Sequence, residues 1–182
     1  MDYILKELEN AVRELENTEN ASFLCPEVQI NFVYARKNAK NINDVAGFPG
    51  RIVRVWNTLK SFTKPAYGAS KHVAKALLVA MKYNSKIRAC MNIKYDKDVE
   101  EACKKAGLKI ASFDRRDEPE EIKKIEGKST EWGINHAIQS VGYVPDVIFD
   151  CGDFGKEPIA FIFGRDPRDV LKKFKKILSN YI

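Results

Sequence analysis

The sequence has little of what several classes of protein require. Its four cysteines form no Cys-x-x-Cys pair, the N-terminus does not read as a secretory signal, and no apolar run approaches the roughly 20 residues of a membrane helix. We therefore expect a cytoplasmic protein with free thiols and no membrane partner, in which Cys90 and Cys151 are small buried hydrophobes. With only His72 and His136, a multi-histidine metal site is hard to assemble.

Two catalytic signatures and a nucleic-acid signature are also absent. No Gly-x-Ser-x-Gly elbow marks a covalent nucleophile, and the turn 152–157 lacks the length and the hydroxyl residue of a Walker loop. Lys and Arg number 31 against 25 Asp and Glu, a net charge of +6, but much of this excess lies on helix faces such as 172–176. Aromatic residues do not alternate with Arg as they do in single-strand binders. The charge suits a small polyanion and not a nucleic acid.

Helix and strand patterns alternate along the 182 residues with no repeat and no linker. The helices are predicted at 2–16, 70–83, 96–106 and 130–141 and from Pro167 onward, and the strands at 29–35, 52–56, 86–95, 108–113, 147–150 and 158–163. The segment 36–51, rich in Asn, Gly and Pro, is predicted to be a long irregular loop. This alternation predicts one layered α/β domain over residues 1–182.

Two stretches, 44–51 and 67–74, join a flexible loop to a cationic or ionisable side chain. Ser70 is expected to cap a helix whose first turn holds Lys71 and His72, where unpaired N–H groups favour an anion. A capped helix with a polar, solvent-facing histidine explains these residues equally well. Arg51 follows a turn-forming run and offers a planar fork to phosphate oxygens, although an ordinary surface arginine at a strand start is the alternative.

Two further segments carry weaker signals. Arg88 and Asn92 share one face of a predicted strand, which either points into a ligand cleft or belongs to an edge strand with one wet face. In and before the turn 152–157, Asp150, Asp153 and Glu157 are candidate oxygen ligands for Mg²⁺, and a charged hairpin without a ligand is the alternative. His136 is expected to be a packed or surface residue.

Four motifs in order, 44–51, 68–74, 88–93 and 152–158, together resemble the archaeal ThiN-type thiamine-phosphate synthases, from about Phe23 to the last helix. The resemblance implies an enzyme that joins hydroxymethylpyrimidine diphosphate to hydroxyethylthiazole phosphate and releases pyrophosphate. It implies a three-layer α/β/α sandwich around a mixed sheet, similar to the class II aldolase fold. Arg51 and His72 match the essential Arg and His of the family.

The residue patterns and the resemblance together give further expectations for the site and its ligands. The expected cofactor is Mg²⁺, which accompanies the diphosphate, with its protein ligands unknown. The partners are phosphorylated small molecules, a second copy in a homo-oligomer, and a hydroxymethylpyrimidine kinase domain to which such chains are often fused. The expected substrate-binding residues are Gly47, Gly50, Gly68, Ala69, Ser70, Lys71, Arg88, Asn92, Asp150, Gly152, Gly155, Lys156 and Glu157.

Two other functions stay open at this point. Related domains joined to DNA-binding segments sense thiamine phosphates and lack the catalytic Arg and His, whereas Arg51 and His72 are both present here. A metal-dependent aldolase or epimerase is suggested by kinship of fold alone, which is a poor guide to reaction.

Overall fold

Seven strands form the central sheet of the computed structural model, which describes residues 2–182. β7 and β8 are parallel and the other neighbouring pairs are antiparallel, so the sheet is mixed. A separate hairpin pairs β3 (Ile52–Val55) with β4 (Thr58–Ser61). The order across the sheet is β5 (Ala66–Tyr67), β2 (Val45–Gly47), β1 (Phe32–Ala35), β6 (Ala89–Lys94), β9 (Ile159–Gly164), β8 (Val147–Asp150) and β7 (Ile110–Phe113).

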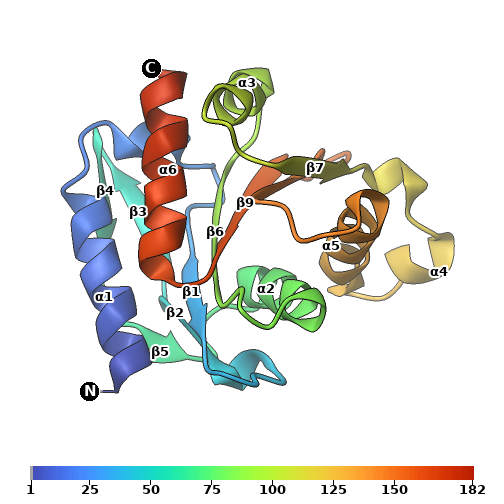
Figure 1. Ribbon diagram of the computed structural model, residues 1–182, viewed down its shortest axis with the longest axis horizontal. Coiled ribbons are helices and arrows are strands. Elements are labelled where there is room, and N and C mark those ends of the chain that lie inside the picture. Colours follow the sequence, from blue (N-terminus) through green and yellow to red (C-terminus); the bar gives the residue numbers. More distant parts are fainter. Residues whose placement is uncertain (1) are drawn as a thin grey trace.

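Helices cover both faces of this sheet (Figure 1). α1 (Tyr3–Glu16), α3 (Lys97–Lys105) and α6 (Pro167–Tyr181) bury their apolar stripes in one hydrophobic cluster with the sheet. α2 (His72–Tyr83) and α5 (Lys128–Val141) share a second cluster with the opposite face. The short α4 (Glu120–Lys123) lies between β7 and α5 in the sequence. The predicted α/β class and mixed sheet are confirmed, and the layers are arranged as helix, sheet and helix.

The helices of the two faces begin differently. On the first face an aspartate caps each helix, because its carboxylate accepts a backbone N–H of the first turn. On the second face neither α2 nor α5 has a side-chain cap. The prediction that Ser70 caps α2 is wrong, since the helix begins at His72 with Lys71 at the N-cap position. The capping bonds are Leu5 N–H to Asp2 (2.9 Å), Val99 N–H to Asp96 (2.8 Å) and Asp169 N–H to Asp166 (2.9 Å).

Three other predictions need correction. The expected loop 36–51 contains a 3₁₀ turn (Ile42–Asp44) and β2, which pairs with β1. β6 lies between β1 and β9, so the edge-strand explanation for Arg88 and Asn92 is wrong. Cys90 is buried as expected, but Cys151 is exposed.

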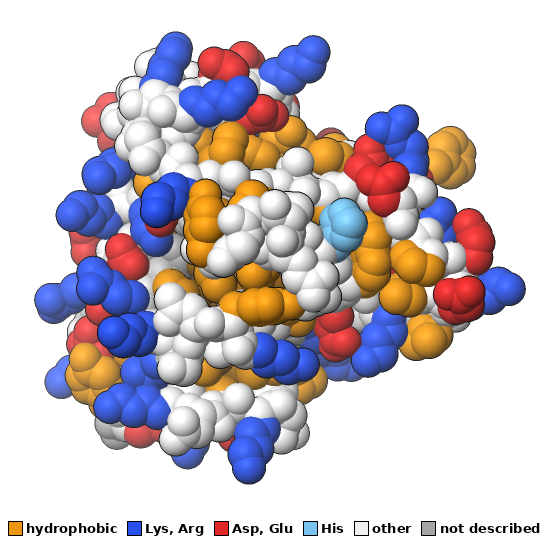
Figure 2. All heavy atoms as spheres, turned by 45° about the vertical axis from the view of Figure 1, so that its right-hand side comes forward, with side chains coloured by type: hydrophobic (Ala, Val, Ile, Leu, Met, Phe, Trp, Pro, Cys, Tyr) orange, Lys and Arg blue, Asp and Glu red, His pale blue; other side chains and the backbone are white. Residues whose placement is uncertain are grey.

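The surface carries its charges mainly around the outline of the face shown in Figure 2, where Lys and Arg side chains surround apolar and uncharged atoms. None of the helices in residues 2–182 combines the length and the apolar character needed to cross a membrane.

Candidate functional site

A cleft of about 980 Å³ lies where the uncapped start of α2 meets several loops. The residues that line it come from seven segments of the chain, which are Val28, Gln29 and Asn31; Phe48, Gly50 and Arg51; Gly68 to Val73; Asn92; Arg115; Gly127, Ser129 and Thr130; and Asp150, Gly155, Lys156, Glu157 and Ile159. The cleft therefore brings together parts of all four motifs, with Arg51 and His72 on one concave surface.

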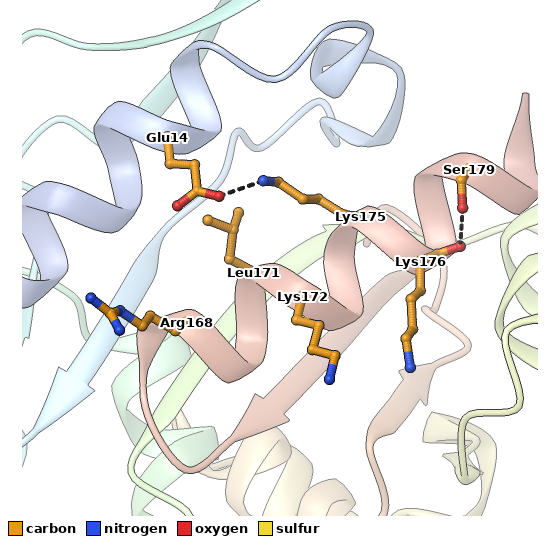
Figure 3. A pocket seen from close by; sticks show the side chains of 7 residues that line it. All are labelled: Glu14, Arg168, Leu171, Lys172, Lys175, Lys176 and Ser179. Carbon is orange, nitrogen blue, oxygen red and sulfur yellow. Dashed lines mark hydrogen bonds and ion pairs between the residues drawn. The ribbon is translucent and has the colours of Figure 1, made fainter.

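A second hollow, of about 720 Å³, lies along the exposed face of α6 (Figure 3). Cations of α6 line it, and one of them, Lys175, pairs with Glu14 of α1. None of its residues belongs to the four motifs. We therefore take the larger cleft as the functional site.

Arg51 stands at the end of a tight turn. Its backbone N–H donates to the carbonyl of Phe48 (3.0 Å) across Pro49 and Gly50, and both Gly50 (φ +78°) and Arg51 (φ +67°) have left-handed backbone. This conformation is uncommon for arginine and costs about 1–3 kcal/mol, a strain that clusters at ligand sites. The Nη1 atom donates to the carbonyl of Val28 at 2.5 Å, which holds the guanidinium beside the cleft.

The start of α2 offers hydrogen-bond donors to the cleft. The first-turn N–H groups of an uncapped helix lack acceptors within the helix, and its dipole favours an anion there. Ser70, just before the helix, is 6% exposed, and its hydroxyl has no protein partner among the described residues. Because no polar side-chain atom among the described residues is both buried and unpartnered, the hydroxyl is not fully enclosed, and Ser70 lines the cleft. Lys71 adds a cation at the same place.

The Nδ1 side of the His72 ring contacts a threonine. Its Nδ1 lies 3.2 Å from the hydroxyl of Thr130 on α5, and its ring centroid lies 5.5 Å from that of Phe161. If the Thr130 hydroxyl donates to Nδ1, the proton of the neutral ring is on Nε2. Nε2 is then a donor for a ligand oxygen.

Charges around His72 set its protonation. Burial among protein atoms lowers its pKa below the ordinary 6.5, and the cations Arg115, Arg51 and Lys75 lower it further, against the opposing effect of Asp150. The imidazole is therefore neutral at pH 7. Arg51 is thus one of the charges that act on the His72 ring.

Arg115 and Asp150 form a buried ion pair at the cleft. Nε of Arg115 lies 3.1 Å from Asp150 Oδ1 and Nη2 lies 2.7 Å from Oδ2, with the two side chains 7% and 2% exposed. Asp150 Oδ1 also accepts the N–H of Gly152 (2.9 Å). Asp150 is thus a structural acceptor as well as a residue that lines the cleft.

Two asparagines join the strands below the cleft. The Asn92 amide oxygen accepts the N–H of Asn31 (2.7 Å), and its Nδ2 donates to the carbonyl of Gln29 (3.0 Å). Asn31 in turn bonds both the N–H and the carbonyl of Phe48. The turn that carries Arg51 is therefore fixed to β6 through side-chain amides.

Most of the predicted binding residues line the cleft, and three do not. Gly47 lies behind it, where an added Cβ would be 3.1 Å from Asn31 Oδ1. Arg88 is turned away, because Nε and Nη2 donate to the carbonyl of Ala35 (3.1 and 2.8 Å). Gly152 is buried, and an added Cβ would lie 2.8 Å from the carbonyl oxygen of Lys156.

The carboxylates considered for Mg²⁺ bind protein groups instead. Besides the contacts of Asp150, Glu157 accepts the N–H groups of Glu27 (2.9 Å) and Val28 (3.1 Å), and Asp153 accepts that of Phe154 (2.8 Å). In the described part of the chain, no three His, Cys, Asp or Glu side chains are grouped to hold a metal. These residues do not form a protein-only cation site.

Sequence reasoning missed several residues that line the cleft. Arg115 sits in the charged connector after β7, and Ser129 and Thr130 begin α5, a helix that was predicted two residues shorter at its start. Gln29 and Asn31 read as ordinary strand residues. One signal was present in the sequence: Gly127 offers no side chain to cap α5. A helix that starts without a cap has free N–H donors in its first turn, as α2 does.

Together the fold and the cleft define a class. This is a mixed α/β sandwich in which an arginine, a neutral histidine and an uncapped helix start converge, an arrangement typical of receptors for phosphorylated small molecules.

The chain belongs to the thiamine-phosphate synthase ThiN family, whose model matches residues 7–176. The match begins earlier than the resemblance seen in the motifs and includes most of α1. The chain is 36% identical over 181 residues to the thiamine-phosphate synthase ThiN of Methanothermobacter thermautotrophicus, covering 98% of this chain and 95% of that protein.

Two further relatives are larger proteins or parts of them. The bifunctional thiamine biosynthesis protein ThiDN of Methanocaldococcus jannaschii is 40% identical over 161 residues, which are 87% of this chain and 37% of that protein. The crystal structure of the C-terminal domain of phosphomethylpyrimidine kinase superposes with a TM-score of 0.90 at 43% identity, covering 96% of this chain and 97% of that one. Related chains thus exist both alone and joined to other domains.

Proposed function

We propose that this cleft joins hydroxymethylpyrimidine diphosphate to hydroxyethylthiazole phosphate and releases pyrophosphate. The family and its named relatives make the chain a transferase of thiamine biosynthesis, a thiamine-phosphate synthase. The observation that carries the proposal is that Arg51, His72 and the uncapped start of α2 share one cleft. Its volume of about 980 Å³ suits two small substrates.

The reaction breaks one bond and forms another at a methylene carbon. The bond from the pyrimidine methylene to the diphosphate oxygen breaks with both electrons left on pyrophosphate. The thiazole nitrogen donates its lone pair to the same carbon and becomes the cationic nitrogen of the product. Negative charge grows on the leaving group, so donors fixed around those oxygens lower the barrier.

The chain's own residues supply these donors. Arg51 binds the leaving oxygens as a charged fork, and the first-turn N–H groups of α2 and the Ser70 hydroxyl bind others. His72, with Thr130 on its Nδ1, donates from Nε2 to a phosphate oxygen. Holding two substrates in line supplies much of the remaining acceleration, so no covalent intermediate with the protein is needed.

Mg²⁺ is proposed as the ion that enters with the diphosphate. When bound, it neutralises part of the charge of the leaving group. The carboxylates at the cleft are engaged with protein groups, so we expect water and substrate oxygens to be most of its ligands.

The other expectations from the sequence and from the family resemblance also remain proposals. They are a cytoplasmic location, a homo-oligomer, fusion to a hydroxymethylpyrimidine kinase domain in a longer protein, and membership of the class II aldolase group of folds. The last of these assigns no reaction.

The test is direct. The purified chain, incubated with both precursors and Mg²⁺, is expected to form thiamine phosphate and pyrophosphate in equal amounts, measured by chromatography and a pyrophosphate assay. A protein that binds thiamine phosphate tightly but forms none would overturn the proposal and support a sensor. Stoichiometric zinc, with no product, would support the metal-dependent aldolase or epimerase.

A further inference from the structure

The proposed reaction brings two separate phosphate-bearing groups into one cleft. The pyrimidine carries a diphosphate and the thiazole carries a monophosphate. Arg51 and the α2 start line the cleft and suit one of them. The second needs donors of its own, because two polyanions sharing the same donors would repel each other.

The start of α5 provides such donors. α5 has 14 residues, and at its N-cap position Gly127 has left-handed backbone and no side-chain cap. Gly127, Ser129 and Thr130 all line the cleft. The Nζ of Lys75 lies 3.4 Å from the carbonyl of Gly127, which places a cation beside this helix start. The N–H of Lys128 donates to the carbonyl of Ile125 (3.3 Å), so the first-turn donors at the cleft are the N–H groups of Ser129 and Thr130, beside the positive end of the helix dipole.

Arg115 is a second, independent indication of a ligand. Only 6% of the residue is exposed, and Asp150 engages its Nε and Nη2. Nη1 makes no hydrogen bond to the described residues, and because none of their polar side-chain atoms is both buried and unpartnered, Nη1 is not fully enclosed by protein; Arg115 itself lines the cleft. The ion pair fixes the guanidinium before a ligand arrives, which lowers the entropy lost on binding.

Contacts place Arg115 beside the start of α5. Glu118, three residues after Arg115, accepts the hydroxyl of Ser129 at 2.5 Å. The charge of Arg115 also acts on His72, whose Nδ1 bonds Thr130. Glu118, which directly follows the 3₁₀ turn that carries Arg115 (Arg115–Asp117), therefore links this segment to the first turn of α5.

We propose that the Nη1 of Arg115 and the first turn of α5 form a second phosphate subsite, which receives the monophosphate of the thiazole. Arg51 and the start of α2 then hold the diphosphate. This assignment rests on the proposed function. It makes Arg115 a binding residue for one substrate only.

The experiment compares two variants that differ only at Arg115. Arg115→Gln alone would leave Asp150 buried and unpaired, so both variants carry Asp150→Asn, whose amide oxygen can still accept from Arg115, and we compare Arg115→Gln/Asp150→Asn with Asp150→Asn. Both are assayed with hydroxyethylthiazole phosphate and with the unphosphorylated thiazole. A hydrogen bond to a charged group is worth about 1.5–3 kcal/mol, so kcat/KM for the phosphate is expected to fall about 10- to 150-fold in the double variant.

The same comparison with the unphosphorylated thiazole should show no loss, and KM for the pyrimidine diphosphate should stay constant. The subsite is overturned if kcat/KM falls equally for the phosphorylated and the unphosphorylated thiazole. It is also overturned if only the KM for the pyrimidine diphosphate changes. If the double variant does not fold, Arg115→Lys keeps a cation opposite Asp150 and faces the same test against the wild type. Absence of product from the wild type overturns the proposed function itself, a different result.

Discussion

The two faces of the sheet start their helices in opposite ways. On the face of α1, α3 and α6, Asp2, Asp96 and Asp166 bind the first-turn N–H groups. On the face of α2 and α5, no side chain does so, and both helix starts open into the cleft. A side-chain cap is worth about 1 kcal/mol to a helix. The comparison teaches that the protein forgoes this stabilisation where a ligand can take its place.

The largest expected effect lies at the uncapped face. Arg51→Ala should lower kcat/KM about 100- to 1,000-fold, because it removes a charged donor from the leaving group. The melting temperature should stay within about 2 °C, because the side chain is exposed. Arg165→Ala, at an exposed arginine next to capped α6, is the matched control and should leave turnover unchanged. Equal activity of the two variants would remove Arg51 from the mechanism.

A carboxylate at the N-cap position of α2 should make the start of this helix resemble the aspartate-capped starts on the other face. Lys71→Asp places a negative charge at the start of α2, where it occupies or repels the position of the diphosphate. We expect KM for the pyrimidine diphosphate to rise about tenfold while the melting temperature stays equal or rises, since the helix dipole favours the new charge. Lys71→Gln, which only removes the cation, should raise KM less. Steady-state kinetics and thermal denaturation of both variants check this, and an unchanged KM in Lys71→Asp contradicts it.

Removing a cap on the other face should change stability alone. Asp166→Ala deletes the acceptor for the N–H of Asp169 and should lower the free energy of unfolding by about 1 kcal/mol. Asp166→Asn keeps a capping oxygen and should lose little of it. Urea denaturation measures both, and kcat/KM should be unaffected in either variant. A loss of turnover in Asp166→Ala would break the separation between the two faces.

The smallest effect concerns pH. The pKa of His72 is lowered in the folded protein, so as pH falls below about 6.5 the unfolded chain takes up this proton before the folded one does. The contribution of neutral His72 to the free energy of unfolding is thus fully present above pH 6.5. It is lost as the pH falls through the pKa that His72 has in the folded protein, which is the lower of the two. His72→Gln should remove this pH dependence, whereas His136→Gln should not.

NMR can follow the same histidine directly, because the chain has only two. Pyrophosphate is expected to raise the pKa of His72, since a nearby anion favours the imidazolium. The signal of His136, whose ring stacks on Trp132 at 5.0 Å, is the internal reference. A His72 signal that titrates at or above 6.5 in the free protein, and does not respond to pyrophosphate, would contradict this part of the account.

The sequence predicted the fold well where periodicity and caps act locally. Strand β8 and the start of α6 at Asp166 were placed correctly, because a buried apolar run and an Asp-Pro start depend only on neighbouring residues. β2 was missed because three residues, Val45–Gly47, form a strand only when β1 and β5 pair with them. Ser70 was misassigned because a serine before a helix can either cap it or leave its donors free, and tertiary structure decides which.

The site was predictable only where its residues carry a local sequence signal. Arg51 and His72 stood in motifs whose glycines and cations signal an anion, and both line the cleft. Arg115 could not be found this way, because its place depends on a pairing with Asp150 across 35 residues of sequence. Arg88 was proposed for its position on a strand face, but the face alone does not show that the carbonyl of Ala35 binds its guanidinium.

Binding of pyrophosphate alone is the most direct test of the central claim, that Arg51 and His72 act on one anion at the uncapped start of α2. Isothermal titration calorimetry should show one pyrophosphate bound by the wild type, weaker binding in Arg51→Ala and in His72→Ala, and a loss in the double variant that differs from the sum of the two single losses. Strictly additive losses, or unchanged affinity in either single variant, would contradict the claim.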